Sequence, residues 1–233
     1  MALMHRLRRL IRRPTSASSV GARHPSPSAP RRGDTIHEDA LRAQLADDPN
    51  NIEAFTALAD MVRRHAAEGH SEPDPLREAE HEFTAAELRS QAADLAVWAL
   101  AEEIGGNPRG WYPLVELGRL SLAEDPEGAV RRFTTAAERD PEGRALAEGL
   151  AILRGAGMPV EALGLGVGHW KVREHTPEVG QHLVRAALEA DRISDAKQHL
   201  RALGLHPDRD AVAKLRTELE KEIAASERRA AGT

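Results

Sequence analysis

The sequence has no cysteine, few aromatic residues and little lysine, and each scarcity narrows what the protein can be. Without cysteine, disulfides, thiolate metal sites and a cysteine nucleophile are excluded. Aromatic residues make up only 3% of the 233 residues, whereas alanine is abundant. Because strands favour aromatic and β-branched residues, this composition predicts close-packed helices. Only four of the 32 basic residues are lysine. Because arginine is so common throughout the chain, a single arginine is weak evidence for a functional role.

Long hydrophobic runs are also missing. No stretch approaches the roughly 18 consecutive apolar residues that a membrane span requires. The arginines of residues 1–13 are not followed by the apolar segment of a signal peptide. We therefore expect no export, and a cytoplasmic protein that is either free or peripheral to a membrane.

Positive charge is concentrated at the N-terminus. Residues 1–33 hold eight arginines and no acid, which gives them a formal charge of +8. Because the net charge of the whole chain is −5, the other 200 residues carry −13. Leu3, Leu7 and Leu10 have helical spacing, which predicts a short amphipathic helix over 2–13 that ends at Pro14. Residues 14–34 are rich in Pro, Ser, Gly and Arg and predict a disordered linker.

Three interpretations of this basic tail stay open. It is a disordered extension, an interfacial anchor for anionic lipid, or a contact for RNA or the ribosome. The acidic body should repel nucleic acid, so no DNA binding is expected and any RNA contact would be confined to the tail. The residues that would make the tail contact are Arg6, Arg8, Arg9, Arg12 and Arg13.

Helical segments after residue 35 recur with a fixed period. Pro108, Pro141 and Pro207 are 33 and 66 residues apart, while Pro177 is three residues out of register and predicts one irregular repeat. The fullest unit reads Leu114-x2-Leu117-Gly118, then Ala129-x3-Phe133-x2-Ala136-x4-Pro141. A second copy of its first helix reads Phe55-x2-Leu58-Ala59-x2-Val62, and the segment from Ala187 to Ala196 matches a turn between helices.

These motifs resemble the tetratricopeptide repeat family, whose unit of about 34 residues contains W-x2-L-G-x2-Y, A-x3-F and P. The resemblance implies an all-α fold, a right-handed α-solenoid of stacked antiparallel helix hairpins. It implies helical repeats over 35–207, interrupted by a charged, Pro-rich insertion at 65–80. The tail 1–34 precedes them, and a capping helix at 208–229 follows.

The resemblance also implies a function, because members of the family bind peptides on the concave face of the first helices. A scaffold or adaptor for another protein is therefore expected. The positions that match the family's concave face are Glu53, Thr56, Asp60, Tyr112, Val115, Arg119, Glu148, Ile152, Gln181, Val184 and Leu188. The competing interpretation places some of these residues in the core between repeats.

Catalytic motifs are not recognisable in this sequence. His65, His70 and His81 share no helix-face spacing, so an ordinary polar loop explains them better than a metal site. Gly164, Gly166 and Gly168 do not match the spacing of a phosphate-binding loop. We expect neither an enzyme nor a bound metal or cofactor.

Overall fold

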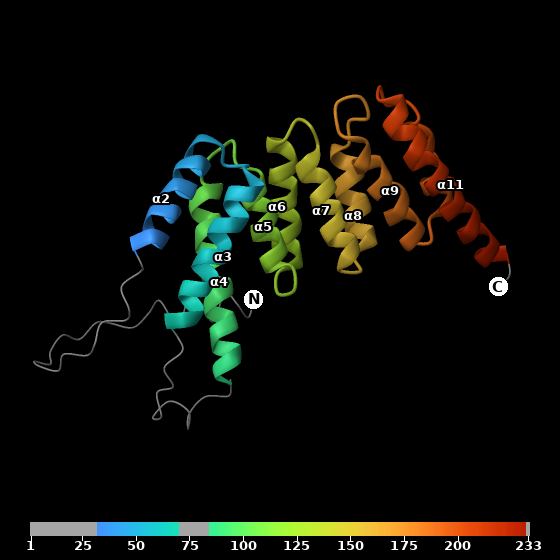
Figure 1. Cartoon of the computed structure of the whole chain (residues 1–233). Coiled ribbons are helices and arrows are strands. Elements are labelled where there is room, and N and C mark those ends of the chain that lie inside the picture. The colour runs from blue at the N-terminus through green and yellow to red at the C-terminus, as the bar shows by residue number, and fades with distance from the viewer. Residues whose placement is uncertain (1–31, 70–83, 232–233) are drawn as a thin grey trace, which may run out of the picture.

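The computed structural model describes residues 32–69 and 84–231, and all regular secondary structure within these ranges is helical (Figure 1). The prediction of an all-α protein is confirmed for this part of the chain. The helices are α2 (Arg32–Asp47), α3 (Ile52–Gly69), α4 (Ala85–Gly105), α5 (Tyr112–Ser121), α6 (Pro126–Arg139), α7 (Arg144–Gly155), α8 (Pro159–His169), α9 (Pro177–Glu189), α10 (Ile193–Leu203) and α11 (Arg209–Ala231).

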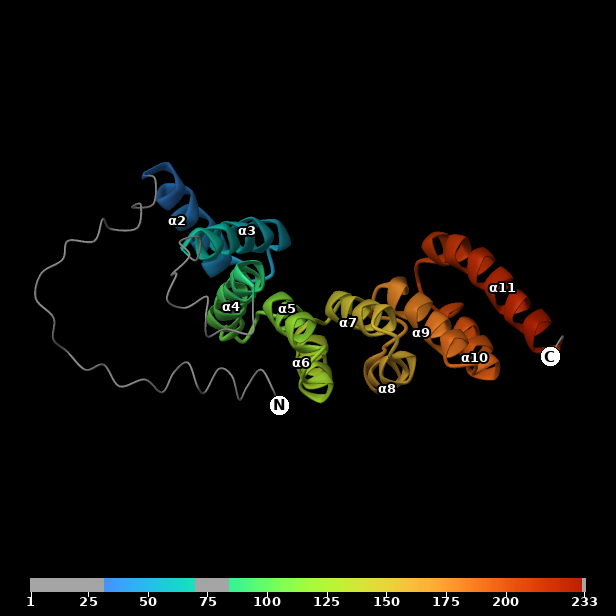
Figure 2. The ribbon, with the colours of Figure 1, turned by 90° about the horizontal axis from the view of Figure 1, so that it is seen from below.

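The helices follow one another in space in the order of the chain (Figure 1). They pack as the pairs α3/α4, α5/α6, α7/α8 and α9/α10, with α2 and α11 at the two ends. Figure 2 shows α3, α5, α7, α9 and α11 on one side of the row and α4, α6, α8 and α10 on the other. We call these two solvent-facing sides the first-helix face and the second-helix face.

The period of the array is regular throughout its second half. The first helices α5, α7, α9 and α11 begin at residues 112, 144, 177 and 209, so successive starts are 32, 33 and 32 residues apart. The irregular repeat predicted from Pro177 is therefore wrong. Pro177 is the first residue of α9, where a missing N–H costs nothing, whereas Pro141 and Pro207 lie in the loops before their helices.

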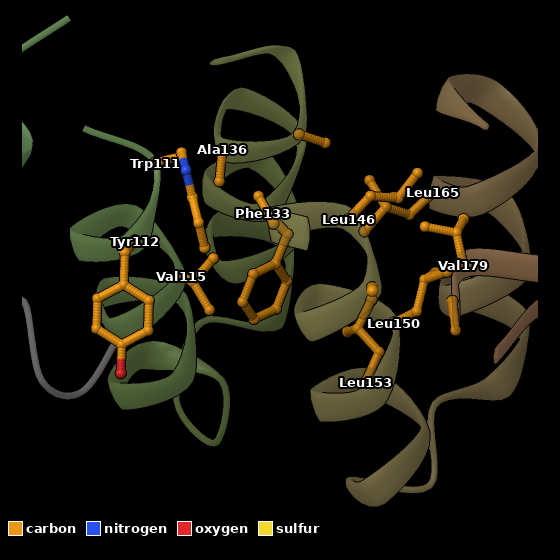
Figure 3. Close-up of a cluster of buried hydrophobic side chains, with 14 of the residues drawn as sticks. Trp111, Tyr112, Val115, Phe133, Ala136, Leu146, Leu150, Leu153, Leu165 and Val179 are labelled. Atoms are coloured by element: carbon orange, nitrogen blue, oxygen red, sulfur yellow. The ribbon is translucent and has the colours of Figure 1, made fainter. Parts of the chain in front are cut away.

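Neighbouring helices approach closely at glycines. The Cβ of any residue that replaced Gly118 would lie 2.4 Å from the Phe133 ring. A Cβ at Gly166 would likewise lie 2.4 Å from the side chain of Leu183. Figure 3 shows Phe133 in the cluster between α5 and α7, with Val115 beside it. Phe133 and Leu183 are completely buried. Contact between helices is thus made by a large side chain on one helix and a bare backbone on the next.

Two of the turns within helix pairs have the same construction. Gly157 after α7 and Asp191 after α9 both have positive φ, at 73° and 57°. The next N–H in each turn reaches back to the helix, with 2.9 Å from Met158 N to Leu153 O and 2.8 Å from Arg192 N to Ala187 O. This hydrogen-bond pattern ends a helix by satisfying its last carbonyls. The interhelical turn predicted around Asp191 is confirmed.

The loops that join one pair to the next are hydrogen-bonded to each other at the first half of the row. Asn50, in the loop before α3, accepts from the backbone N–H groups of Trp111 at 2.7 Å and Tyr112 at 3.1 Å. Arg139, at the end of α6, donates to the carbonyl oxygens of Gly105, Asn107 and Gly110 at 2.9–3.0 Å. These bonds fix where α5 begins relative to its neighbours on both sides.

The same linkage continues along the second half. The N–H of Thr176 donates to the carbonyl of Glu142 at 2.8 Å, and His206 Nε2 lies 3.0 Å from the carbonyl oxygen of His175. Because His206 Nδ1 accepts from Asp208 N at 3.0 Å, Nε2 carries the proton and donates. The loops before α7, α9 and α11 therefore form a continuous hydrogen-bonded series.

Three predicted boundaries change. Helix α2 begins at Arg32, so the last residues of the predicted tail are helical, and α3 continues to Gly69, so the insertion begins later than residue 65. Helix α11 extends to Ala231. The predicted helix at 2–13 and the rest of the tail lie outside the described residues, as do residues 70–80 of the insertion. None of the described helices is long and apolar enough to cross a membrane.

The contact of Phe133 with Gly118 predicts the effect of adding one methyl group. Gly118→Ala must displace the Phe133 ring, so we expect the unfolding free energy to fall by about 1–3 kcal/mol. Urea denaturation followed by circular dichroism measures the change. Gly155→Ala is the matched control, because a Cβ there meets nothing within 4 Å. Equal stability of Gly118→Ala and the wild type would contradict the packing described for α5 and α6.

Candidate interaction surface

The row of helices is curved, with α3 near one end and α11 at the other (Figure 2). The first-helix face is the inner side of this curve. Helices α5, α7, α9 and α11 contact each other in sequence along it. Of the eleven predicted binding residues, those that reach solvent are the exposed Glu53, Thr56, Asp60, Arg119 and Glu148 and the half-buried Ile152, Gln181 and Leu188.

Two of the predicted binding residues are core residues instead. Val115 and Val184 are completely buried, and Val115 lies against the cluster around Phe133 (Figure 3). A partner on the surface does not reach side chains that are completely buried. Their prediction as groove residues is wrong, and the competing interpretation as core between repeats is right for these two positions.

Tyr112 is held in a cluster that joins α3 to α5. Its ring packs edge-on against Phe55 and Trp111, with centroid distances of 5.3 and 5.8 Å. The Glu116 carboxylate and the Thr56 hydroxyl lie near the hydroxyl of Tyr112. Burial first, and then the Glu116 charge, raise the pKa of the Tyr112 phenol. Only 9% of Tyr112 is exposed, so it positions α3 against α5 more than it offers a surface for contact.

Unpaired acids and partly exposed apolar side chains share the first-helix face. Neither Glu53 on α3 nor Glu148 on α7 has an ion-pair partner within residues 32–69 and 84–231, and both are exposed. Ile152, one helical turn after Glu148, and Leu188 on α9 are half-buried and pack against the core with part of their surface. The face therefore offers negative charge beside apolar contact area.

An arginine links α7 to α9 on this face. Arg154 Nε donates to Glu189 Oε2 at 2.9 Å, and Arg154 Nη1 lies 2.8 Å from His182 Nδ1. Because a guanidinium can only donate, His182 Nδ1 accepts and the imidazole is neutral. The Arg154 side chain is 15% exposed, so this ion pair is better protected from water than the surface pairs of the molecule.

A second arginine continues the linkage from α9 to α11. Arg185 Nη2 donates to Glu222 at 2.8 Å and to Glu218 at 2.5 Å. The hydrogen bond with Glu222 is the largest cause that raises the pKa of Arg185. Helices α7, α9 and α11 are thus joined on their solvent side by two successive charged clusters.

His182 lies between these two arginines. Burial, followed by the charges of Arg154 and Arg185, lowers its pKa to about 4, and Glu189 opposes this shift. A proton on His182 would remove its acceptor from Arg154 and place a third positive charge in the cluster. His182 is therefore a structural acceptor at neutral pH.

Sequence reasoning missed Arg154, Arg185 and Glu189, and it interpreted His182 only as an ordinary surface histidine or one hydrogen-bonded between helices. The pairs that they form are separated by 28 to 37 residues, which is close to one repeat period. An acid about one period after each arginine was the available signal. It is a weak signal, because the side chains meet only if both helices present the correct face.

Other chemistry is not favoured by the described part of the chain. Within the described ranges, no group of three or more His, Asp and Glu residues could hold a metal ion. Gly164, Gly166 and Gly168 lie in the helix α8 and not in a phosphate-binding loop. The tail arginines Arg6, Arg8, Arg9, Arg12 and Arg13 lie outside the described residues, as do His70 and His81.

Comparisons with known proteins add no assignment. No protein-family model, curated protein or solved structure matches this chain.

The lowered pKa of His182 predicts a defined loss of stability in acid. Above pH 6.5 the imidazole is neutral in both states. As the pH falls from 6.5 to about 4, the unfolded chain takes up the proton first, so the unfolding free energy declines, by at most about 1.4 kcal/mol per pH unit. Below that window the loss is complete. Urea denaturation at a series of pH values measures this decline.

His182→Gln should flatten the pH dependence between 4 and 6.5, because glutamine offers Arg154 an acceptor that does not titrate. The exposed His37 provides the control, and His37→Gln should leave the curve unchanged. If His182→Gln follows the wild-type curve throughout this window, the histidine is not buried between the arginines.

Proposed function

We propose that the protein is a scaffold or adaptor that binds a peptide or helix of another protein on its first-helix face, and that it is not an enzyme. In this proposal the helix pairs form a right-handed α-solenoid of tetratricopeptide type, with the first-helix face as its concave side. The observation that carries the proposal is that Glu53 and Glu148, which have no ion-pair partner among the described residues, share one continuous inner face with partly exposed apolar residues.

The regular spacing of the first helices supports this assignment. Starts that are 32 or 33 residues apart place equivalent positions of α5, α7 and α9 side by side. The hydrogen-bonded loops hold this spacing, so a surface for a partner is present before the partner arrives. A preformed surface avoids the cost of ordering the scaffold on binding.

The chemistry of the face indicates the kind of partner. Burial of apolar surface on Ile152 and Leu188 would contribute about 25 cal/mol per Å² before ordering costs. Glu53 and Glu148 would attract positive charge. The expected partner is therefore an amphipathic or extended segment that carries both apolar and basic residues, with Thr56, Asp60, Arg119 and Gln181 as further polar contacts.

Site-specific photo-cross-linking tests the proposal. A photoreactive amino acid at Ile152 should link reproducibly to one partner protein, and Glu148→Lys should reduce that yield at least severalfold because it repels a basic segment. The same amino acid at Arg131, which is exposed on α6, is the control on the second-helix face. Equal yields of the same products from both positions would contradict a binding role for the first-helix face.

The charge asymmetry of the sequence favours a second candidate function. Residues 1–33 have a formal charge of +8 on a chain whose net charge is −5. A membrane-surface or ribosome-bound adaptor, recruited by Arg6, Arg8, Arg9, Arg12 and Arg13, would use this charge. Such a tether is compatible with partner binding on the first-helix face.

Liposome co-sedimentation tests the tether. The intact chain should partition onto vesicles with anionic lipid more than a chain in which Arg8 and Arg12 are both changed to Glu, and high salt should remove the difference. Neutral vesicles are the control. Equal partitioning of both chains onto anionic vesicles would exclude recruitment to lipid by the tail.

A further inference from the structure

Equivalent positions of the first helices form rows across the first-helix face. Glu116, Glu148 and Gln181 are the fifth residues of α5, α7 and α9, which lie side by side (Figure 2). Because Glu116 is only 8% exposed, Glu148 carries most of the accessible charge of this polar row. Leu120 and Ile152, one helical turn later in α5 and α7, are half-buried and pack against the core with part of their surface. An apolar row therefore runs beside the polar row.

The charge that is left uncompensated on this face is negative. Each arginine of α5, α7 and α9 is already paired with an acid of the chain, and these arginines are Arg119, Arg144, Arg154 and Arg185. By contrast, Glu148 on α7 and Glu178 on α9 are exposed and have no ion-pair partner among the described residues. Glu53 on α3 is the third such acid. A basic segment on this face would therefore meet acids that lack a partner.

One segment of this chain has the complementary composition. Residues 2–13, which we call the basic segment, contain five arginines and no acid. Leu3, Leu7 and Leu10 have helical spacing, so they share one side of the helix that the sequence predicts there. Such a helix can place its leucines on the apolar row while its arginines reach the acids. This is the chemistry that the proposed function expects of a partner.

The length of chain before α2 lets the basic segment reach the face. Residues 14–31 join it to Arg32, the first residue of α2, and 18 residues span at most about 60 Å. Helix α2 packs against α3, and its 16 residues are about 24 Å long. Because packed helices lie roughly 10 Å apart, α5 and α7 are within about 40 Å of Arg32. The connecting residues are therefore long enough.

We propose that the basic segment binds across α5 and α7 on the first-helix face of its own chain and competes there with the partner protein. Its leucines pack on Leu120 and Ile152, and its arginines lie against Glu148 and the other unpaired acids. A connection of this length holds the segment at an effective concentration of about millimolar, so even a weak contact occupies much of the face. The inference rests on the proposed function, because the contact is inhibitory only if the same face binds a partner.

Photo-cross-linking in the purified full chain tests the contact. A photoreactive amino acid at Ile152 should link to the basic segment of the same molecule. Mass spectrometry of the monomer, after cleavage at glutamate, identifies this product. The yield per molecule should not depend on protein concentration, and it should fall in high salt. The same amino acid at Arg131, which is exposed on α6, is the control and should not give this product.

Charge reversal tests the pairing. Arg8→Glu with Arg12→Glu should reduce the intramolecular yield at least about fivefold, because the segment then repels the acids of the face. Glu148→Lys should also reduce the yield, and its combination with the two tail changes should restore part of it. Arg131→Glu with Arg201→Glu, on the second-helix face, changes the net charge by the same amount and should leave the yield unchanged.

Competition with the partner is measured with the same chains. In cell extract, the chain with Arg8→Glu and Arg12→Glu should link Ile152 to the partner at least about twofold more than the wild type, because more of the face is free.

Several results would overturn the proposal. Absence of an intramolecular link from Ile152, or an equal yield in the chain with Arg8→Glu and Arg12→Glu, excludes the contact. A link that forms only between molecules would assign the face to a second copy. If a partner links at Ile152 and the basic segment does not, this proposal fails and the proposed function stands. If the basic segment links and no partner does in either chain, the contact stands and the proposed function fails.

Discussion

The structure depends on contact between one helix pair and the next. A single pair has a buried side but no separate core, so it needs a neighbour to cover its apolar surface. Phe133 on α6 meets the bare backbone of Gly118 on α5, and Leu183 on α9 meets that of Gly166 on α8. The second of these contacts crosses from one pair to the next. Stability therefore accumulates along the row.

Polar contacts set the geometry that these apolar contacts allow. The loops between pairs are hydrogen-bonded to each other from Asn50 to His206, and partly or fully buried hydrogen bonds of this kind favour one arrangement over similar ones. On the first-helix face, Arg154 and Arg185 join three successive helices. The row is thereby held at one spacing.

Local features of this fold could be predicted from the sequence. The helical pattern and the turn at Asp191 both follow from residues close in the chain. Pro177 was misleading because proline is equally suited to a loop before a helix and to the first helical position. Its place in register therefore says little about where the helix begins.

The candidate site was less predictable, because it depends on the angle at which helices meet. Neighbouring residues on a helix differ by about 100° in direction, so a small rotation decides whether Val115 and Val184 face a partner or the next helix. Arg154 and Glu189 are 35 residues apart, and only the assembled row brings them together. Sequence periodicity supplied the repeat, but the tilt of each helix determined which side chains were left exposed.

Native-state hydrogen exchange of a variant destabilised at one end tests the linear stack most directly. Leu219 is completely buried in α11, so Leu219→Ala should lose several kcal/mol locally. If stability is passed from pair to pair, amide exchange should accelerate strongly in α9–α11 and little in α3–α5. Equal acceleration in all helices would show a single cooperative core and would contradict the account.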